Sequence, residues 1–268
     1  MRIFFLKEDI PEERGTDREK YGLSKSTCSG CWTLYGEYLE LDTDNQIINL
    51  DYIYDFNGFR DILCYNLAES DKNWITWEHK KIPYISYSLV PQHIVFTGVY
   101  PFHNCTAKLV KTNSIFYRLS EYYNNIIIFS LSTTAISAGN IKIAVGHAKI
   151  LLDEIDKIPE DTPLYTFVSS LKGWITTAHK LIYTMFIYTF DPETLNINGL
   201  SPIFIPPKSH TAVIYPCGLS HTSEDWLISY GDGDSRAKIL FIPHSQVNDM
   251  IIPVEKINPE THQFIVYN

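Results

Sequence analysis

Carboxylates gather near the C-terminal end of the chain, in the segment Tyr230-Gly231-Asp232-Gly233-Asp234. Three apolar runs lie in this region: one ends at Tyr215, and the others cover residues 226–230 and 239–242. They predict an antiparallel meander of three strands, in which the acidic segment forms the turn between the second and third strands. Glycine lets the backbone approach a ligand closely at a strand end. We therefore expect Asp234 to be a site carboxylate, although a turn carboxylate that caps backbone N–H groups would fit the same pattern.

Further side chains could take part in acid–base chemistry or bind an anion. The other candidate carboxylates are Asp61, Glu78 and Asp232. Arginine offers a two-pronged hydrogen-bond donor and lysine a point charge, while histidine either binds or is held structurally. The candidates for an anionic ligand are Arg60, Lys72, His93, His147 and Arg236.

Two features leave alternatives open. Trp74 and Tyr230 could stack on a sugar ring, although aromatic residues in strands more often pack in a core. Asp232-Gly233-Asp234 is a DxD string, which could bind Mn²⁺ or Mg²⁺ through hard oxygen ligands. A turn explains the same string without a metal. We therefore assign no metal-binding residues from the sequence and leave Mn²⁺ or Mg²⁺ binding as an alternative.

The composition favours a globular β protein. The chain has 268 residues, 45% of them hydrophobic, with 18 Tyr and 14 Phe, and aromatic and β-branched residues favour strands. A net charge of −9 disfavours nucleic acid as a partner. We also expect no membrane span and no signal peptide. The five cysteines, Cys28-Ser-Gly-Cys31 included, show no disulfide framework, which fits a reduced cytoplasmic compartment.

Short apolar runs separated by turn residues recur from Trp32 onward, which indicates a sandwich, barrel or propeller. We expect residues 1–268 to form one domain, with residues 1–31 partly loop. One segment, 150–182, breaks the rhythm. Thr162-Pro163 has the form of an N-cap followed by proline at the first helical position, and apolar residues follow at helical spacing, which predicts a helical insertion. The predicted strands lie at 32–41, 47–54, 61–67, 74–77, 84–89, 94–99, 107–111, 114–119, 126–131, 141–145, 183–190, 202–205, 212–215, 226–230, 239–242 and 264–267.

Several short motifs, taken in their order, carry a resemblance to a known family. They are Lys72-Asn73-Trp74, the segment 84–95, Ala144-Val145-Gly146-His147, Tyr188-Thr189-Phe190-Asp191, and Pro216-Cys217-Gly218-Leu219 with the acidic segment 230–234. In this order they resemble the blades of five-bladed β-propellers of the glycoside hydrolase family 130 type. They are similar in particular to propeller proteins of large DNA viruses, including β-xylosyltransferase-type proteins of algal viruses. The resemblance implies an all-β fold, a single five-bladed β-propeller with a short helical insertion.

The chain also departs from that family. The family's Glu-Asp-Pro-Arg motif is missing, and Phe59-Arg60-Asp61 is its nearest remnant. The resemblance therefore implies a glycosyltransferase that moves a sugar, xylose for example, from a nucleotide sugar, most simply a UDP-sugar, to a glycan acceptor. Glycosylation of a viral capsid in the host cytoplasm is the setting it implies. In this interpretation Asp234, Asp61 and Glu78 are the catalytic candidates. The substrate is bound by Asp232 together with the basic and aromatic residues above. A glycoside phosphorylase or hydrolase and a non-catalytic carbohydrate-binding propeller remain alternatives.

Overall fold

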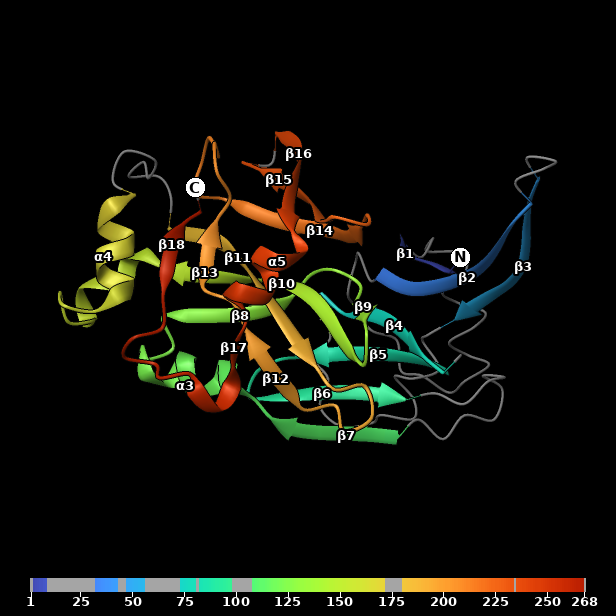
Figure 1. Ribbon diagram of the computed structural model, residues 1–268, viewed down its shortest axis with the longest axis horizontal. Coiled ribbons are helices and arrows are strands. Elements are labelled where there is room, and N and C mark those ends of the chain that lie inside the picture. Colours follow the sequence, from blue (N-terminus) through green and yellow to red (C-terminus); the bar gives the residue numbers. More distant parts are fainter. Residues whose placement is uncertain are drawn as a thin grey trace. The chain divides into compact units, whose positions relative to one another are not determined.

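The computed structural model describes residues 2–8, 32–42, 47–55, 73–80, 82–97, 108–171, 180–233 and 235–267 (Figure 1). The chain divides into two compact units, one of Met1–Lys72 with Val99–Ala107 and one of Asn73–Gly98 with Lys108–Asn268. That residues 1–268 form one domain stays a prediction. The predicted strand over 61–67 lies outside the described residues.

The first unit contains a three-stranded antiparallel sheet. Its strands are β1 (Arg2–Glu8), β2 (Trp32–Asp42) and β3 (Ile47–Asp55), paired in the order β1-β2-β3. The strands predicted over 32–41 and 47–54 are confirmed as β2 and β3.

The second unit begins with a four-stranded antiparallel meander. Its strands are β4 (Ile75–His79), β5 (Ile82–Ser88), β6 (Gln92–Thr97) and β7 (Lys108–Asn113), paired in chain order. These four strands match the predicted runs at 74–77, 84–89, 94–99 and 107–111, with bounds that differ by a few residues.

The largest sheet of the second unit has eight strands. Its main path is β17-β12-β11-β10-β8; β9 pairs with β10, and β13 pairs with β11 and, in parallel, with β18. The long central strands β10 and β11 are buried along most of their length, so they carry the core. The bounds are β8 (Ile127–Leu131), β9 (Ile136–Ala138), β10 (Ile141–Leu151), β11 (Leu181–Phe190), β12 (Ile197–Leu200), β13 (Ile203–Ile205), β17 (Ile252–Pro253) and β18 (Phe264–Val266).

The C-terminal meander predicted from the sequence is present. β14 (Ile214–His221), β15 (Asp225–Asp232) and β16 (Arg236–Pro243) pair antiparallel in chain order. The register shifts between Pro216 and Gly218. The alternating burial along β15 places Trp226, Ile228 and Tyr230 on the buried face.

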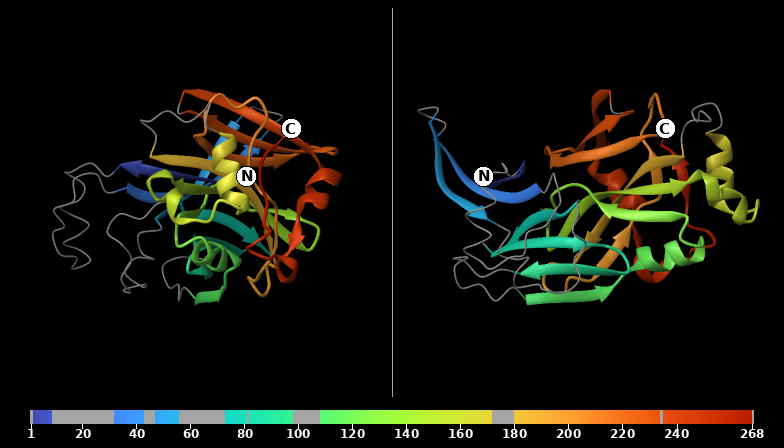
Figure 2. Two further views of the ribbon diagram at one scale, coloured as in Figure 1. Left: turned by 90° about the vertical axis from the view of Figure 1, so that its left-hand side faces the viewer. Right: turned by 180° about the vertical axis from the view of Figure 1, so that it is seen from behind.

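The helical insertion is also confirmed. α4 (Pro163–Ser170) begins at Thr162, whose side chain accepts a hydrogen bond from the Tyr165 backbone N–H, and Pro163 occupies the first helical position. The 3₁₀ helix η2 (Leu152–Lys157) precedes it. α4 lies beside β18, where Phe167 contacts Phe264 (Figures 1 and 2).

One predicted strand is wrong. A strand was expected over 114–119, but residues 115–119 lie in α3 (Ile115–Tyr122), with Ser114 as its N-cap, and the helix packs against β8. Its inward residues are Ile115, Phe116, Leu119 and Ser120, a helical spacing that a short apolar window hides. The other helices are α5 (His244–Met250) and η3 (Val254–Lys256).

The second unit and the small first sheet are thus built mostly from antiparallel β-sheet, as the sequence predicted. Within the described part of the chain no helix has the length and apolar composition to cross a bilayer.

Candidate functional site

Side chains from three sheets converge around His147 in the second unit. His147 lies on β10, Tyr183 on the neighbouring strand β11, Tyr215 on β14, and Asn73 just before β4, while Ser132 follows β8. We call these five residues the His147 cluster. β14 lies against both β10 and β11, which brings the third sheet onto this face of the central one.

The strand register explains how β10 and β11 aim their side chains. Lys149 pairs with Tyr183 and His147 with Met185. Side chains two apart on a strand share a face, and paired residues point to the same side. His147, Lys149 and Tyr183 therefore lie on one face of the sheet. Lys149 Nζ stands over the Tyr183 ring, 5.5 Å from its centre, an arrangement that stabilises a cation.

His147 is fully buried and closely surrounded. Its Nδ1 lies 2.7 Å from Ser132 Oγ. The Tyr215 ring lies 4.9 Å away between centres, and the Tyr183 ring is nearly parallel to the imidazole at 6.0 Å. Ser132, Tyr183 and Tyr215 are only half-buried. A buried imidazole is thus connected to the surface through a hydroxyl and two aromatic rings.

Tyr215 joins the cluster to the start of β4. Its hydroxyl donates to Asn73 Oδ1 at 2.9 Å, and Asn73 has a left-handed backbone with φ of 70°. Burial raises the pKa of Tyr215, with smaller contributions from Cys217 and Tyr183, so the phenol stays protonated and keeps donating. The adjacent Trp74 contacts Tyr87, and its buried indole nitrogen has no acceptor among the described residues.

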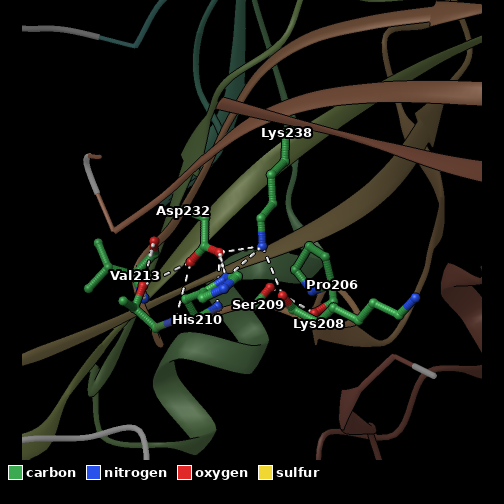
Figure 3. Close-up of polar contacts among 8 residues, drawn as sticks. Pro206, Lys208, Ser209, His210, Val213, Asp232 and Lys238 are labelled. Carbon is green, nitrogen blue, oxygen red and sulfur yellow. Dashed lines mark hydrogen bonds and ion pairs between the residues drawn. The ribbon is translucent and has the colours of Figure 1, made fainter. Parts of the chain in front are cut away.

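The predicted site residue Asp232 lies in a second polar group, at the end of β15 (Figure 3). Its side chain is completely buried and pairs with Lys238 Nζ at 2.7 Å. The backbone N–H of His210 donates to it at 2.8 Å, and the N–H and hydroxyl of Thr211 donate at 3.2 and 3.1 Å. Lys238 in turn donates to the Lys208 carbonyl at 2.8 Å.

These contacts keep Asp232 ionised. Burial alone would raise the pKa of Asp232, but the hydrogen bonds from Lys238, His210 and Thr211 outweigh it and lower the pKa to about 2. The carboxylate is therefore saturated with donors, and it fastens the loop 208–211 to the hinge of the meander. Gly233, the next residue, has φ of +66° and lies against Thr211.

His93, predicted as an anion ligand, is buried in a third polar group. Trp77 Nε1 donates to Ser86 Oγ at 3.0 Å, Ser86 Oγ lies 3.3 Å from His93 Nε2, and His93 Nδ1 donates to the Leu195 carbonyl at 2.9 Å. Burial lowers the pKa of His93 to about 4, so the ring is neutral near pH 7. In this environment it links the first meander to the turn before β12.

The remaining predicted residues are dispersed. Tyr230 is buried on β15, Arg236 is exposed and opposite Asp232 in the register, and Trp74 borders the His147 cluster. Glu78 is exposed, and its backbone carbonyl accepts from Lys142. The structure thus brings His147 and Trp74 to one place. Asp234, Asp61, Lys72 and Arg60 lie outside the described residues.

Four residues of the His147 cluster were not singled out from the sequence. Ser132, Tyr183 and Tyr215 lie in or next to predicted strands, where nothing local distinguishes them from core residues. Asn73 stands between Lys72 and Trp74 in a motif that carries the family resemblance, but its neutral amide is a weaker sequence signal than the charge of Lys72. Among the described residues, no three side chains of His, Cys, Asp or Glu gather in a way that could hold a metal ion.

No protein-family model matches the chain, and no curated protein matches it.

Proposed function

We propose that the chain is a carbohydrate-active protein of the glycosyltransferase class, which moves a sugar such as xylose from a UDP-sugar to a glycan acceptor. The observation that carries this proposal is the convergence of Tyr183, Tyr215 and Asn73 on His147. Sugar rings combine apolar faces with hydroxyl edges, so aromatic rings beside amide and imidazole groups suit them. Lys149 supplies a positive charge near Tyr183 for a phosphate.

The proposal includes an architecture. We regard the separate antiparallel meanders, β4 to β7 and β14 to β16, as blades of a five-bladed β-propeller, with β4, β10 and β14 closest to its centre. Support comes from the way Asn73, His147 and Tyr215 meet from three sheets. An experimental structure of the full chain would test it, and sheets stacked face to face as a sandwich would contradict it. Capsid glycosylation in the cytoplasm of an infected host remains part of the proposal.

A non-catalytic carbohydrate-binding protein is the second candidate. The observation that favours it is the state of Asp232, whose oxygens are taken by Lys238, His210 and Thr211. A carboxylate held in this way has little capacity to accept a proton from a substrate hydroxyl. If the chain is a glycosyltransferase, its catalytic base must therefore be Asp234, Asp61 or Glu78 and not Asp232. The phosphorylase or hydrolase alternative gains no support from the described residues.

Thermal-shift titration separates these functions. The full chain is screened with UDP, GDP, their sugars and free glycans, with and without EDTA. Stabilisation by a UDP-sugar is expected, because a ligand of the folded state raises the unfolding temperature. A response to free glycans alone would favour the binding protein. Loss of the nucleotide response only with EDTA would favour a metal at the DxD string, and no response to either class would contradict the proposal.

Variants then locate the binding site. Tyr215→Phe removes the hydroxyl that holds Asn73, and Tyr183→Ala removes a ring of the cluster. A lost hydrogen bond of this kind costs about 0.5–1.5 kcal/mol, so we expect UDP-sugar affinity to fall roughly two- to tenfold for Tyr215→Phe. Tyr117→Phe is the matched control, because Tyr117 is exposed on α3. Equal affinities in all variants would move the site elsewhere.

A further inference from the structure

The chain contains two serine–histidine pairs in the described residues, and they differ in access. In the first, Ser86 and His93 are both fully buried, and Ser86 Oγ lies 3.3 Å from His93 Nε2. In the second, Ser132 is half-buried, His147 is fully buried, and Ser132 Oγ lies 2.7 Å from His147 Nδ1. Of these two pairs, only the second has a serine that is not fully buried.

The two pairs also differ in what engages the serine oxygen. Ser86 Oγ accepts from Trp77 Nε1 and its O–H donates to His93 Nε2, whose ring in turn donates from Nδ1 to the Leu195 carbonyl, so Ser86 is one link of a buried structural chain. For Ser132 the one hydrogen bond described is that to His147. A short contact between a hydroxyl and an imidazole nitrogen is the geometry in which histidine removes the proton as serine attacks.

We propose that Ser132 and His147 form a nucleophile–base pair that hydrolyses carboxylic esters. Ser132 Oγ attacks the ester carbonyl carbon, and His147 Nδ1 takes the hydroxyl proton. The tetrahedral intermediate collapses, the bond to the alcohol oxygen breaks, and His147 returns the proton to the departing alcohol. Water, deprotonated by His147, then attacks the acyl-serine, which releases the carboxylic acid and restores Ser132. The step needs only the ester and water.

The surroundings indicate which esters fit. The Tyr183 and Tyr215 rings flank the imidazole, so an alcohol portion with an apolar face, such as a sugar ring or an aromatic alcohol, would pack beside the reacting bond. This activity requires no nucleotide and does not depend on the proposed glycosyltransferase. If no UDP-sugar binds, ester hydrolysis can still be found, and the reverse also holds.

The experiment uses the full chain and a fluorophosphonate, which reacts with activated serine hydroxyls and leaves a stable adduct. We expect one equivalent of label, located on Ser132 by peptide mapping, together with slow hydrolysis of p-nitrophenyl acetate. Labelling should slow as the solution becomes acidic, because a protonated imidazole cannot act as base. A wild-type chain that stays unlabelled, or that carries its label on another residue, would overturn the proposal.

Two variants and a control complete the test. Ser132→Ala should lose both label and ester hydrolysis. It should stay folded but unfold at a somewhat lower temperature, because Nδ1 of the buried His147 loses its hydrogen bond with Ser132 Oγ. His147→Gln should slow labelling by about 10²- to 10⁴-fold, the usual contribution of a general base. Ser130→Ala is the control, since Ser130 is the half-buried serine that pairs with His147 across β8 and β10. Equal loss in Ser130→Ala would contradict the assignment. If His147→Gln does not fold, the mapped label and its pH dependence decide.

Discussion

At the scale of single residues, Asp232 shows that a structural carboxylate and a ligand-binding carboxylate can have the same sequence pattern. A glycine-flanked aspartate at a strand end predicts a ligand site, and here the same position holds a carboxylate that is saturated by protein donors. The pattern is the same because both roles need a backbone that can approach closely. What separates them is the position of Lys238 and of the loop 208–211, which the sequence does not reveal.

We expect Asp232→Asn to destabilise the protein by roughly 2–3 kcal/mol, since it leaves the partly buried Lys238 without its counter-charge. The pH dependence has a definite sign. The folded pKa of about 2 lies below the ordinary 3.8, so the contribution is complete above pH 3.8 and is lost as the pH falls toward 2. Urea unfolding at pH 7 and pH 3 measures it.

Asp225→Asn is the control for this prediction, because Asp225 lies at the opposite end of the same strand and its side chain has no ion pair among the described residues. A loss of stability in Asp225→Asn equal to that in Asp232→Asn would contradict the role of the Lys238 pair.

At the scale of elements, the motif Ala144-Val145-Gly146-His147 has a packing explanation beside a functional one. A Cβ at Gly146 would lie 2.3 Å from Phe186 Cζ and 2.8 Å from the Ser130 carbonyl oxygen. Phe186 is completely buried, so it has no room to retreat. Glycine at this position therefore allows β8, β10 and β11 to pack closely behind His147.

We expect Gly146→Ala to lower the free energy of unfolding by about 1–3 kcal/mol, the usual penalty for an overpacked core. The same substitution should weaken the binding of a ligand at the His147 cluster. Gly231→Ala is a matched control on a strand of the other sheet, because its added Cβ would meet nothing nearer than 3.9 Å. Unfolding by urea measures both. Similar small losses in the two variants would show that β10 can shift to make room.

The elements differ in how far local sequence specifies them. α4 was predictable because Thr162 and Pro163 mark its start directly. α3 was not, since its apolar residues form one short run that also suits a strand. The strands of the two meanders follow from turn residues between apolar runs, which is local information as well.

At the scale of the whole molecule, the all-β class could be predicted, but of the candidate site only His147 and the bordering Trp74 could. Tyr215 and Asn73 are hydrogen-bonded although 142 residues separate them, and no local pattern encodes that pairing. The convergence on His147 depends on which sheets pack together. The same is true of the difference between the Ser86–His93 pair, which is fully buried, and the Ser132–His147 pair, whose serine is half-buried.

Two buried histidines make the stability of the second unit sensitive to mild acid. Burial lowers the pKa of His93 and of His262 to about 4, against an ordinary value of 6.5. Both rings are nearly inaccessible, and the Nε2 atom of His262 has no hydrogen-bond partner among the described residues. Protonation therefore favours the unfolded chain.

The sign follows from proton uptake. Between pH 6.5 and 4 the unfolded chain binds more protons than the folded one, so the free energy of unfolding falls as the pH is lowered through this range. Each histidine contributes on the order of 3 kcal/mol at the acid end, at about 1.4 kcal/mol per pKa unit.

Urea unfolding at pH 7.5, 5.5 and 4.5 tests this pH dependence. His93→Gln should be less stable at pH 7.5, because it disturbs the bonds to Ser86 and Leu195, yet lose less on acidification. His79→Gln, which changes a histidine that is hydrogen-bonded to the exposed Glu193, should keep the steep wild-type dependence. A free energy of unfolding that stays constant from pH 7.5 to 4.5 would mean that the two rings gain solvent or a carboxylate partner in solution.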